Sequence, residues 1–208
     1  RGKMEAAALG IDPATGAVLV HVGGLSWGKS QFDRSWQAKR QLGSTFKPFI
    51  YIAALEAGQN QADTLVDSPA EFAGASPDRP WRPQNYDDEY HGVMTYRDAL
   101  AHSRNVPAVR LLDRVGIPPV AAVTKRMGLE SAMGEGLASA LGVGSATLYD
   151  LTAAYASLPT GGMRPEPYRI RAVFGPDGAN LWRSSPLPPR RVLSPQVAYV
   201  AADMLRAV

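Results

Sequence analysis

The sequence of 208 residues predicts an α+β fold, with antiparallel strand hairpins near its two ends and helices between them. Two observations support this prediction. Apolar runs flank the turn-forming segments 12–16 and 175–178, as in β-hairpins. Between these hairpins, apolar residues recur at helical spacing in segments that open with capping residues or proline. A composition of 45% hydrophobic and 20% charged residues is ordinary for a folded protein with a core.

The first expected elements are a hairpin and a buried helix. Residues 6–11 and 17–22 are predicted to pair as strands, because a proline after aspartate and a closing glycine are typical of a turn. Residues 44–57 predict a helix that is apolar on nearly every side and therefore lies in a core, with Gly58 as its stop. Residues 59–94 show no periodicity and predict a long loop with a functional role.

The later elements are shorter. Helices are expected over 95–102, 107–115, 118–127 and 147–158, a second hairpin over 168–174 and 180–183, and a last helix from Ser194 to the end. The chain is thus expected to form one partial domain with three regions. These are an N-terminal hairpin over 1–24, a mainly helical region over 44–160, and a small hairpin with the final helix over 167–208.

Composition excludes several classes of protein. The absence of cysteine excludes disulfide scaffolds, thiol nucleophiles and cysteine-held metal centres. A net charge of +3 from scattered basic residues argues against a nucleic-acid reader. The apolar run at 49–55 is far shorter than the ~20 residues that span a bilayer. His21, His91 and His102 lack metal-ligand spacing, so no metal and no cofactor is expected, and the acidic run 87–89 is expected to be a solvated loop.

Two overlapping glycine patterns offer alternative chemistries. Residues 23–30 match the phosphate-binding loop of P-loop nucleotide hydrolases, with Lys29 as its lysine, and residues 24–28 match a nucleophile elbow around Ser26. Both motifs need a parallel-sheet strand followed by a helix, whereas this segment leaves a hairpin and continues without a helical apolar face. A P-loop hydrolase is retained as an alternative of a different class.

A third motif is Ser44-Thr45-Phe46-Lys47 at the start of the buried helix. This spacing puts Ser44 and Lys47 on one face, one turn apart. A lysine within so apolar a segment is desolvated, and it also sits near the positive end of the helix dipole, so its pKa is expected to be lowered. Such a lysine can be a neutral base for the serine hydroxyl. The alternative interpretation, a capping serine beside a solvated lysine, conflicts with the apolar surroundings.

A second polar triplet, Ser103-Arg104-Asn105, lies between two predicted helices. Together with the serine–lysine motif, it makes two of the three signatures of penicillin-interacting serine enzymes. With the segments 12–24, 32–48, 81–86 and 95–110, and with Leu141 to Gly162, the sequence resembles the transpeptidase domain of class A (bifunctional) penicillin-binding proteins along most of its length.

The resemblance implies the penicillin-binding fold, an antiparallel sheet flanked by helices, and acyl transfer between peptidoglycan stem peptides. Ser44 would attack the D-alanyl-D-alanine bond with Lys47 as its base. Ser103 would relay a proton to the leaving D-alanine, and Asn105 would bind substrate and orient Lys47. β-Lactam antibiotics would acylate Ser44. The location implied is the extracytoplasmic face of a bacterial membrane, and a sensor or β-lactamase of the same fold remains an alternative.

One signature of the family is not found in the sequence. No lysine is followed by Thr-Gly or Ser-Gly, the third motif, which the family carries on a later strand of its sheet. The later strands, the membrane anchor and the glycosyltransferase of the family are not recognised either. We therefore expect the chain to be part of a domain, completed by a further segment or a second chain.

Overall fold

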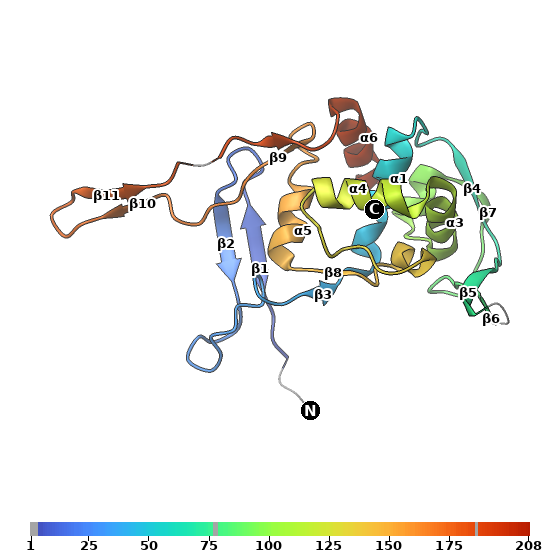
Figure 1. The fold of residues 1–208 in the computed structure, drawn as a ribbon, viewed down its shortest axis with the longest axis horizontal. Coiled ribbons are helices and arrows are strands. Elements are labelled where there is room, and N and C mark those ends of the chain that lie inside the picture. Colours follow the sequence, from blue (N-terminus) through green and yellow to red (C-terminus); the bar gives the residue numbers. More distant parts are fainter. Residues whose placement is uncertain (1–3, 77–78, 186) are drawn as a thin grey trace. The chain divides into compact units, whose positions relative to one another are not determined.

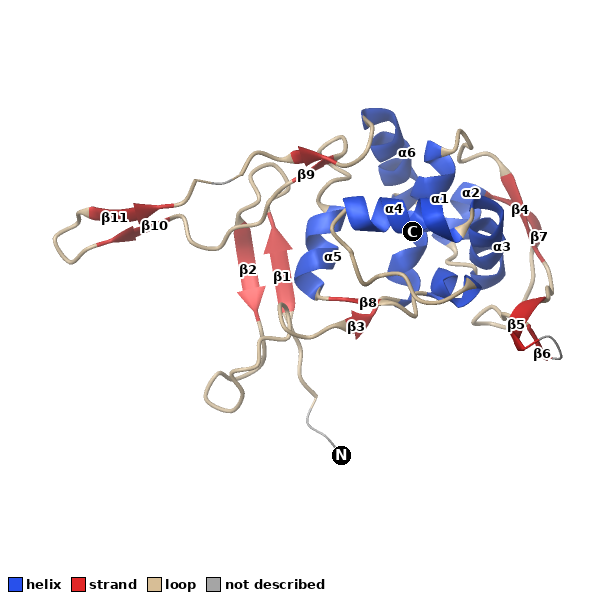
Figure 2. Cartoon of the chain, in the orientation of Figure 1, coloured by secondary structure: helices blue, strands red, loops and turns tan. Residues whose placement is uncertain are grey.

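The computed structural model describes residues 4–76, 79–185 and 187–208, and its elements are drawn in Figures 1 and 2. The chain divides into two compact units. The first comprises Arg1–Arg40, Met127–Leu129 and Ala146–Ala198, and the second comprises Gln41–Arg126, Glu130–Ser145 and Tyr199–Val208. In the described residues, no helix is both long enough and apolar enough to cross a membrane.

The first unit contains the predicted N-terminal hairpin. Strands β1 (Ala8–Ile11) and β2 (Val18–Val22) pair in antiparallel register. Asp12 closes their turn by accepting a hydrogen bond from the Thr15 hydroxyl at 2.5 Å. Gly16 has a φ of +79°, a conformation that side chains rarely adopt, and a Cβ there would meet a backbone oxygen at 2.5 Å. The turn chemistry therefore accounts for the hairpin.

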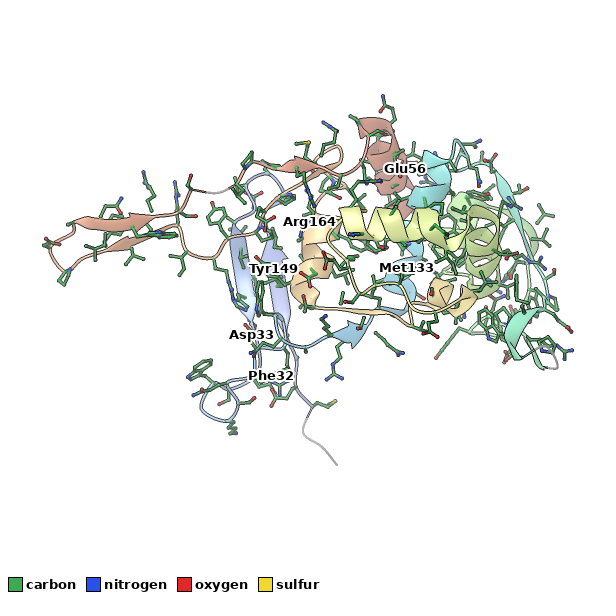
Figure 3. The ribbon with its side chains drawn as sticks, in the orientation of Figure 1. Phe32, Asp33, Glu56, Met133, Tyr149 and Arg164 are labelled. Atoms are coloured by element: carbon green, nitrogen blue, oxygen red, sulfur yellow. The ribbon has the colours of Figure 1, made fainter. Side chains whose placement is uncertain are left out.

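Helix α5 (Leu148–Tyr155) packs against β1 within this unit. Thr147 begins the helix as predicted, because its side chain accepts a hydrogen bond from the backbone N–H of Asp150 at 3.0 Å. Tyr149, labelled on α5 in Figure 3, meets Trp36 edge to face with ring centroids 4.3 Å apart. This aromatic pair fixes the segment that follows β2 against the helix.

The remaining strands of the first unit form two short pairs. The predicted second hairpin is present as β10 (Ala172–Phe174) and β11 (Asn180–Arg183). Strands β9 (Met163–Arg164) and β12 (Arg190–Arg191) also pair, and their two-residue length left no periodic signal in the sequence. Helix α6 (Pro195–Leu205) begins after Ser194, as predicted, and its residues divide between the two units.

The glycine-rich segment after β2 folds as a series of turns. The backbone N–H groups of Lys29 and Ser30 both donate to the carbonyl oxygen of Ser26, at 3.2 and 3.1 Å. No residue from 23 to 42 is helical. A phosphate-binding loop and a nucleophile elbow each require a helix directly after the loop. The structure therefore contradicts both the P-loop hydrolase alternative and the elbow around Ser26.

The second unit is a helical core around α1 (Lys47–Glu56). This helix packs against α3 (Asn105–Val115) and α4 (Ile117–Arg126), and Figure 1 shows the three grouped together. Every residue from Phe46 to Ala54 is buried. The predicted helix apolar on all sides is therefore confirmed, and its position in the core follows from the absence of a polar face.

Three shorter helices also belong to this unit. Helix α2 (Tyr96–Ala101) is capped by Thr95, as the sequence predicts. A 3₁₀ helix, η1 (Gly43–Phe46), leads directly into α1, and a second one, η2 (Leu137–Leu141), packs against α3.

Residues 59–94 are not the continuous loop that their composition predicts. Four strands lie here: β4 (Thr64–Asp67) pairs with β7 (Gly92–Thr95), and β5 (Phe72–Ser76) pairs with β6 (Arg79–Trp81), as Figure 2 shows. The strands are three to five residues long, and β4 finds its partner more than twenty residues away. Such short strands carry too few alternating positions to be recognised. The last two strands, β3 (Arg40–Gln41) and β8 (Ser145–Ala146), lie where the chain passes between units.

Candidate active site

Ser44 lies in the tight turn that opens the core helix. It belongs to η1, and the predicted helix over 44–57 is found as this 3₁₀ turn followed by α1. The backbone N–H of Lys47 donates to the carbonyl oxygen of Ser44, which closes the turn. Because side chains three residues apart eclipse one another in a 3₁₀ helix, Ser44 and Lys47 lie on the same face. Ser44 is exposed, whereas Lys47 is buried.

The backbone before Ser44 is held by the segment that follows η2. The N–H of Leu42 donates to the carbonyl of Gly144 at 3.1 Å, and the N–H of Gly43 donates to that of Gly142 at 3.0 Å. Gly142 has a φ of +71°, and a Cβ there would lie 2.0 Å from the carbonyl oxygen of Gly43. Only glycine allows this approach, so the position of the serine turn depends on it.

Lys47 is the centre of a hydrogen-bonded cluster. Its side chain is 1% exposed, and Nζ donates to the Ser103 carbonyl at 2.5 Å, to Ser103 Oγ at 3.1 Å and to Asn105 Oδ1 at 2.7 Å. In the part of the chain that the structure describes, Ser44 Oγ is not among its acceptors. Burial first, and the positive charge of Arg104 second, lower the pKa of Lys47 to about 8. The predicted direction of this pKa shift is confirmed.

The Ser103 triplet forms the connection between α2 and α3. Ser103 has a φ of +51°, which is uncommon for a residue with a side chain and is often found at functional sites. Its N–H donates to the Leu100 carbonyl at 2.9 Å. Asn105 is the first residue of α3, which therefore begins two residues before the predicted start at residue 107. This turn directs the carbonyl and hydroxyl of Ser103 to the same lysine.

Three buried polar residues, one of them the middle residue of the triplet, form a network that the sequence reasoning missed. Asp67 is 0% exposed and Arg104 is 6% exposed, and Arg104 Nε donates to Asp67 at 2.9 Å. Asn85 is also buried and accepts hydrogen bonds from the backbone N–H groups of Asn105 and Val106, at 2.9 and 3.2 Å. The only signals in the sequence were the position of Arg104 inside the triplet and of Asn85 in the segment 81–86.

The acidic run 87–89 is exposed, as predicted, but it is not merely solvated. Asp87 Oδ2 accepts a hydrogen bond from Arg104 Nη1 at 2.7 Å, and this contact holds the pKa of Asp87 below its usual range. Asp87, Glu89 and His91 place one ligand atom each within 4.8 Å of one another, all three being exposed.

The fold is that of penicillin-binding transpeptidase domains. A crystal structure of penicillin-binding protein 1A from Haemophilus influenzae superposes with a TM-score of 0.91 at 30% identity, over 97% of this chain and 34% of that one. The family model for the penicillin-binding protein transpeptidase domain matches residues 6–208, and the chain belongs to this family. The predicted fold class is therefore confirmed.

Two further relatives define the extent of the similarity. Penicillin-binding protein 1A of Aquifex aeolicus is 38% identical over 205 residues, which are 99% of this chain and 28% of that protein. The structure of PonA1 from Mycobacterium tuberculosis in complex with penicillin V aligns at 25% identity and a TM-score of 0.82, over 95% of this chain and 54% of that one. The chain spans about a quarter of the length of the curated relatives it matches.

Proposed function

We propose that this chain carries the acyl-transfer centre of a D-alanyl-D-alanine transpeptidase, which cross-links peptidoglycan stem peptides through an acyl-enzyme on Ser44. The observation that carries the proposal is the buried Lys47, whose ammonium position is fixed by Ser103 and Asn105 one helical turn from an exposed serine. Membership of the transpeptidase family supports the same reaction.

In the first step, Ser44 Oγ attacks the carbonyl carbon of the penultimate D-alanine, and its proton passes to neutral Lys47 Nζ. A lysine with a pKa of about 8 is neutral in a useful fraction of molecules near pH 7, whereas an ordinary lysine is not. Ser44 also lies in the first turn of a helical segment, where backbone N–H groups lack helical partners and can stabilise the oxyanion.

In the second step, the peptide bond to the terminal D-alanine breaks. Ser103 Oγ, 3.1 Å from Lys47 Nζ, gives a proton to the leaving amine and takes one from the lysine, so the proton taken from Ser44 leaves with D-alanine. An amine of a neighbouring stem peptide then attacks the acyl-enzyme. That attack forms the cross-link, and Ser44 Oγ recovers its proton. Attack by water instead would give carboxypeptidase activity.

β-Lactams are proposed to acylate Ser44 because their strained amide imitates the D-alanyl-D-alanine end. The similarity to PonA1, which was solved with penicillin V, supports this proposal. Because peptidoglycan is assembled outside the cell membrane, we place the protein at the extracytoplasmic face of a bacterial membrane.

The test uses the protein as the cell makes it, a stem pentapeptide ending in D-alanyl-D-alanine and an acceptor amine. The expected result is release of D-alanine and a cross-linked product, detected by mass spectrometry and abolished by Ser44→Ala. Ser26→Ala is the matched control, since it removes another serine and should leave the rate unchanged. Hydrolysis of β-lactam with no cross-linked product would indicate the β-lactamase alternative and refute the proposal.

A further inference from the structure

The guanidinium of Arg104 donates hydrogen bonds to three different residues. Nε donates to Asp67 at 2.9 Å, Nη1 donates to Asp87 at 2.7 Å, and Nη2 donates to the carbonyl oxygen of Glu89. Each nitrogen thus meets a different group, and the planar fork is what allows this. An ammonium group is a single point and cannot occupy these three positions together.

Asp67 is the anchor of this network. It is the last residue of β4, it is fully buried, and its two oxygens accept hydrogen bonds from different side chains. Oδ2 accepts from Arg104, whereas Oδ1 accepts from the Asn85 amide at 2.7 Å. A buried carboxylate is tolerated only when its charge is paired and its lone pairs are satisfied, and this arrangement provides both.

Asn85 transmits the position of Asp67 to the start of α3. Its amide donates to Asp67 and to the carbonyl of Glu89, and its Oδ1 accepts from the N–H groups of Asn105 and Val106. Those N–H groups belong to the first turn of the helix and have no helical partner. Asn85 therefore holds the backbone of Asn105 in place. The side chain of Asn105 is held as well, because its Nδ2 donates to the carbonyl of Gln84 at 2.9 Å.

The network affects Lys47 in two ways, through the position of its hydrogen-bond acceptors and through the charge near it. It holds the strained turn at Ser103, with its φ of +51°, in the position from which both Ser103 and Asn105 accept from Lys47. It also brings a fixed positive charge near that lysine. Among the described residues, Arg104 is the charged group whose field acts on Lys47, since Ser103 and Asn105 are neutral.

We propose that Arg104, held by Asp67 and Asp87, is a positioning residue for the acyl transfer: it fixes the turn that binds Lys47 and places a positive charge near that lysine. This inference rests on the proposed function. It adds a residue that acts through the turn at Ser103 and through Lys47, and it gives the middle residue of the triplet a role of its own.

The test compares three variants of the protein as the cell makes it. Arg104→Lys keeps the charge and loses the fork. The double variant Arg104→Met with Asp67→Asn removes both buried charges together, which avoids leaving one of them unpaired in the core. Arg126→Lys is the matched control, because Arg126 forms an ion pair with Glu56 at the far end of α1. The second-order rate of acylation by benzylpenicillin is measured from pH 6 to pH 10, together with the melting temperature.

For Arg104→Lys we expect acylation to fall roughly tenfold or more at every pH, because the turn loses two of its three anchors. For the double variant we expect, in addition, that the rising limb of the pH profile is displaced to higher pH, because the positive charge that lowers the pKa of Lys47 is gone. A displacement of about half a pH unit lowers the neutral fraction of Lys47 at pH 7 roughly threefold. The control should match the unmodified protein in both respects.

Two results would overturn the inference. In the first, both Arg104 variants acylate at the original rate with an unchanged limb. In the second, the loss of acylation rate in each variant equals its unfolded fraction and the rising limb of the pH profile stays in place, as expected for an ion pair with only a structural role. Failure of the proposed function is distinguishable, because then the unmodified protein itself would form no adduct on Ser44.

Discussion

The lowered pKa of Lys47 predicts the pH dependence of acylation. With a pKa of about 8, about one molecule in eleven carries neutral Lys47 at pH 7, against about one in three thousand for a lysine with its ordinary pKa of 10.5. The environment thus raises the fraction of neutral Lys47, the proposed base, about 300-fold, which corresponds to about 3 kcal/mol. The acylation rate should rise nearly tenfold for each pH unit below 8 and level off above it.

Stopped-flow measurement of acylation by a fluorescent penicillin between pH 5.5 and pH 10 tests this prediction. Lys47→Arg supplies the comparison, because a guanidinium stays protonated throughout this range. That variant should show no rising limb and should acylate at least about 300-fold more slowly at pH 8. A flat profile for the unmodified protein would refute the assignment of Lys47 as the base, and a limb centred near pH 10 would contradict its lowered pKa.

Three further predictions concern stability and geometry. The free energy of unfolding should rise between pH 8 and pH 10.5, since the unfolded chain alone binds a proton at Lys47 in that window, and Lys47→Met should remove this rise in urea titrations. Gly142→Ala should lower the free energy of unfolding by about 3 kcal/mol or more and slow acylation, because its Cβ collides with Gly43 beside the serine turn. Gly136→Ala is the control, since Gly136 also has a positive φ but lies in open space, and equal losses in the two variants would argue against a collision. Thr95→Ala should lower the free energy of unfolding by about 1 kcal/mol through loss of the α2 cap, and an unchanged denaturation midpoint would contradict this.

The core helix could be predicted because its signal is local. An apolar segment without a polar face belongs in a core, and a lysine inside it must be desolvated, so the burial of Lys47 and the direction of its pKa followed from neighbouring residues. Its contacts with Ser103 and Asn105, more than fifty residues away, came from the family resemblance. No spacing rule predicts them.

The network behind the triplet could not be predicted for a physical reason. Charged residues are almost never buried unless paired, and the pairing of Asp67 with Arg104 joins residues 37 positions apart. The strand that carries Asp67 has four residues, and its partner strand lies beyond a long irregular segment. Asn85, which has no periodic context, gains its role only when the first turn of α3 is placed beside it.

The central claim is that Ser44 is the residue acylated. Exposure of the protein as the cell makes it to benzylpenicillin, followed by intact-mass measurement and peptide mapping, tests this claim most directly. We predict one penicilloyl group per molecule, mapped to the peptide that contains Ser44 and absent from Ser44→Ala. A folded protein that gains no adduct, or an adduct that persists in the Ser44→Ala variant, would contradict the account.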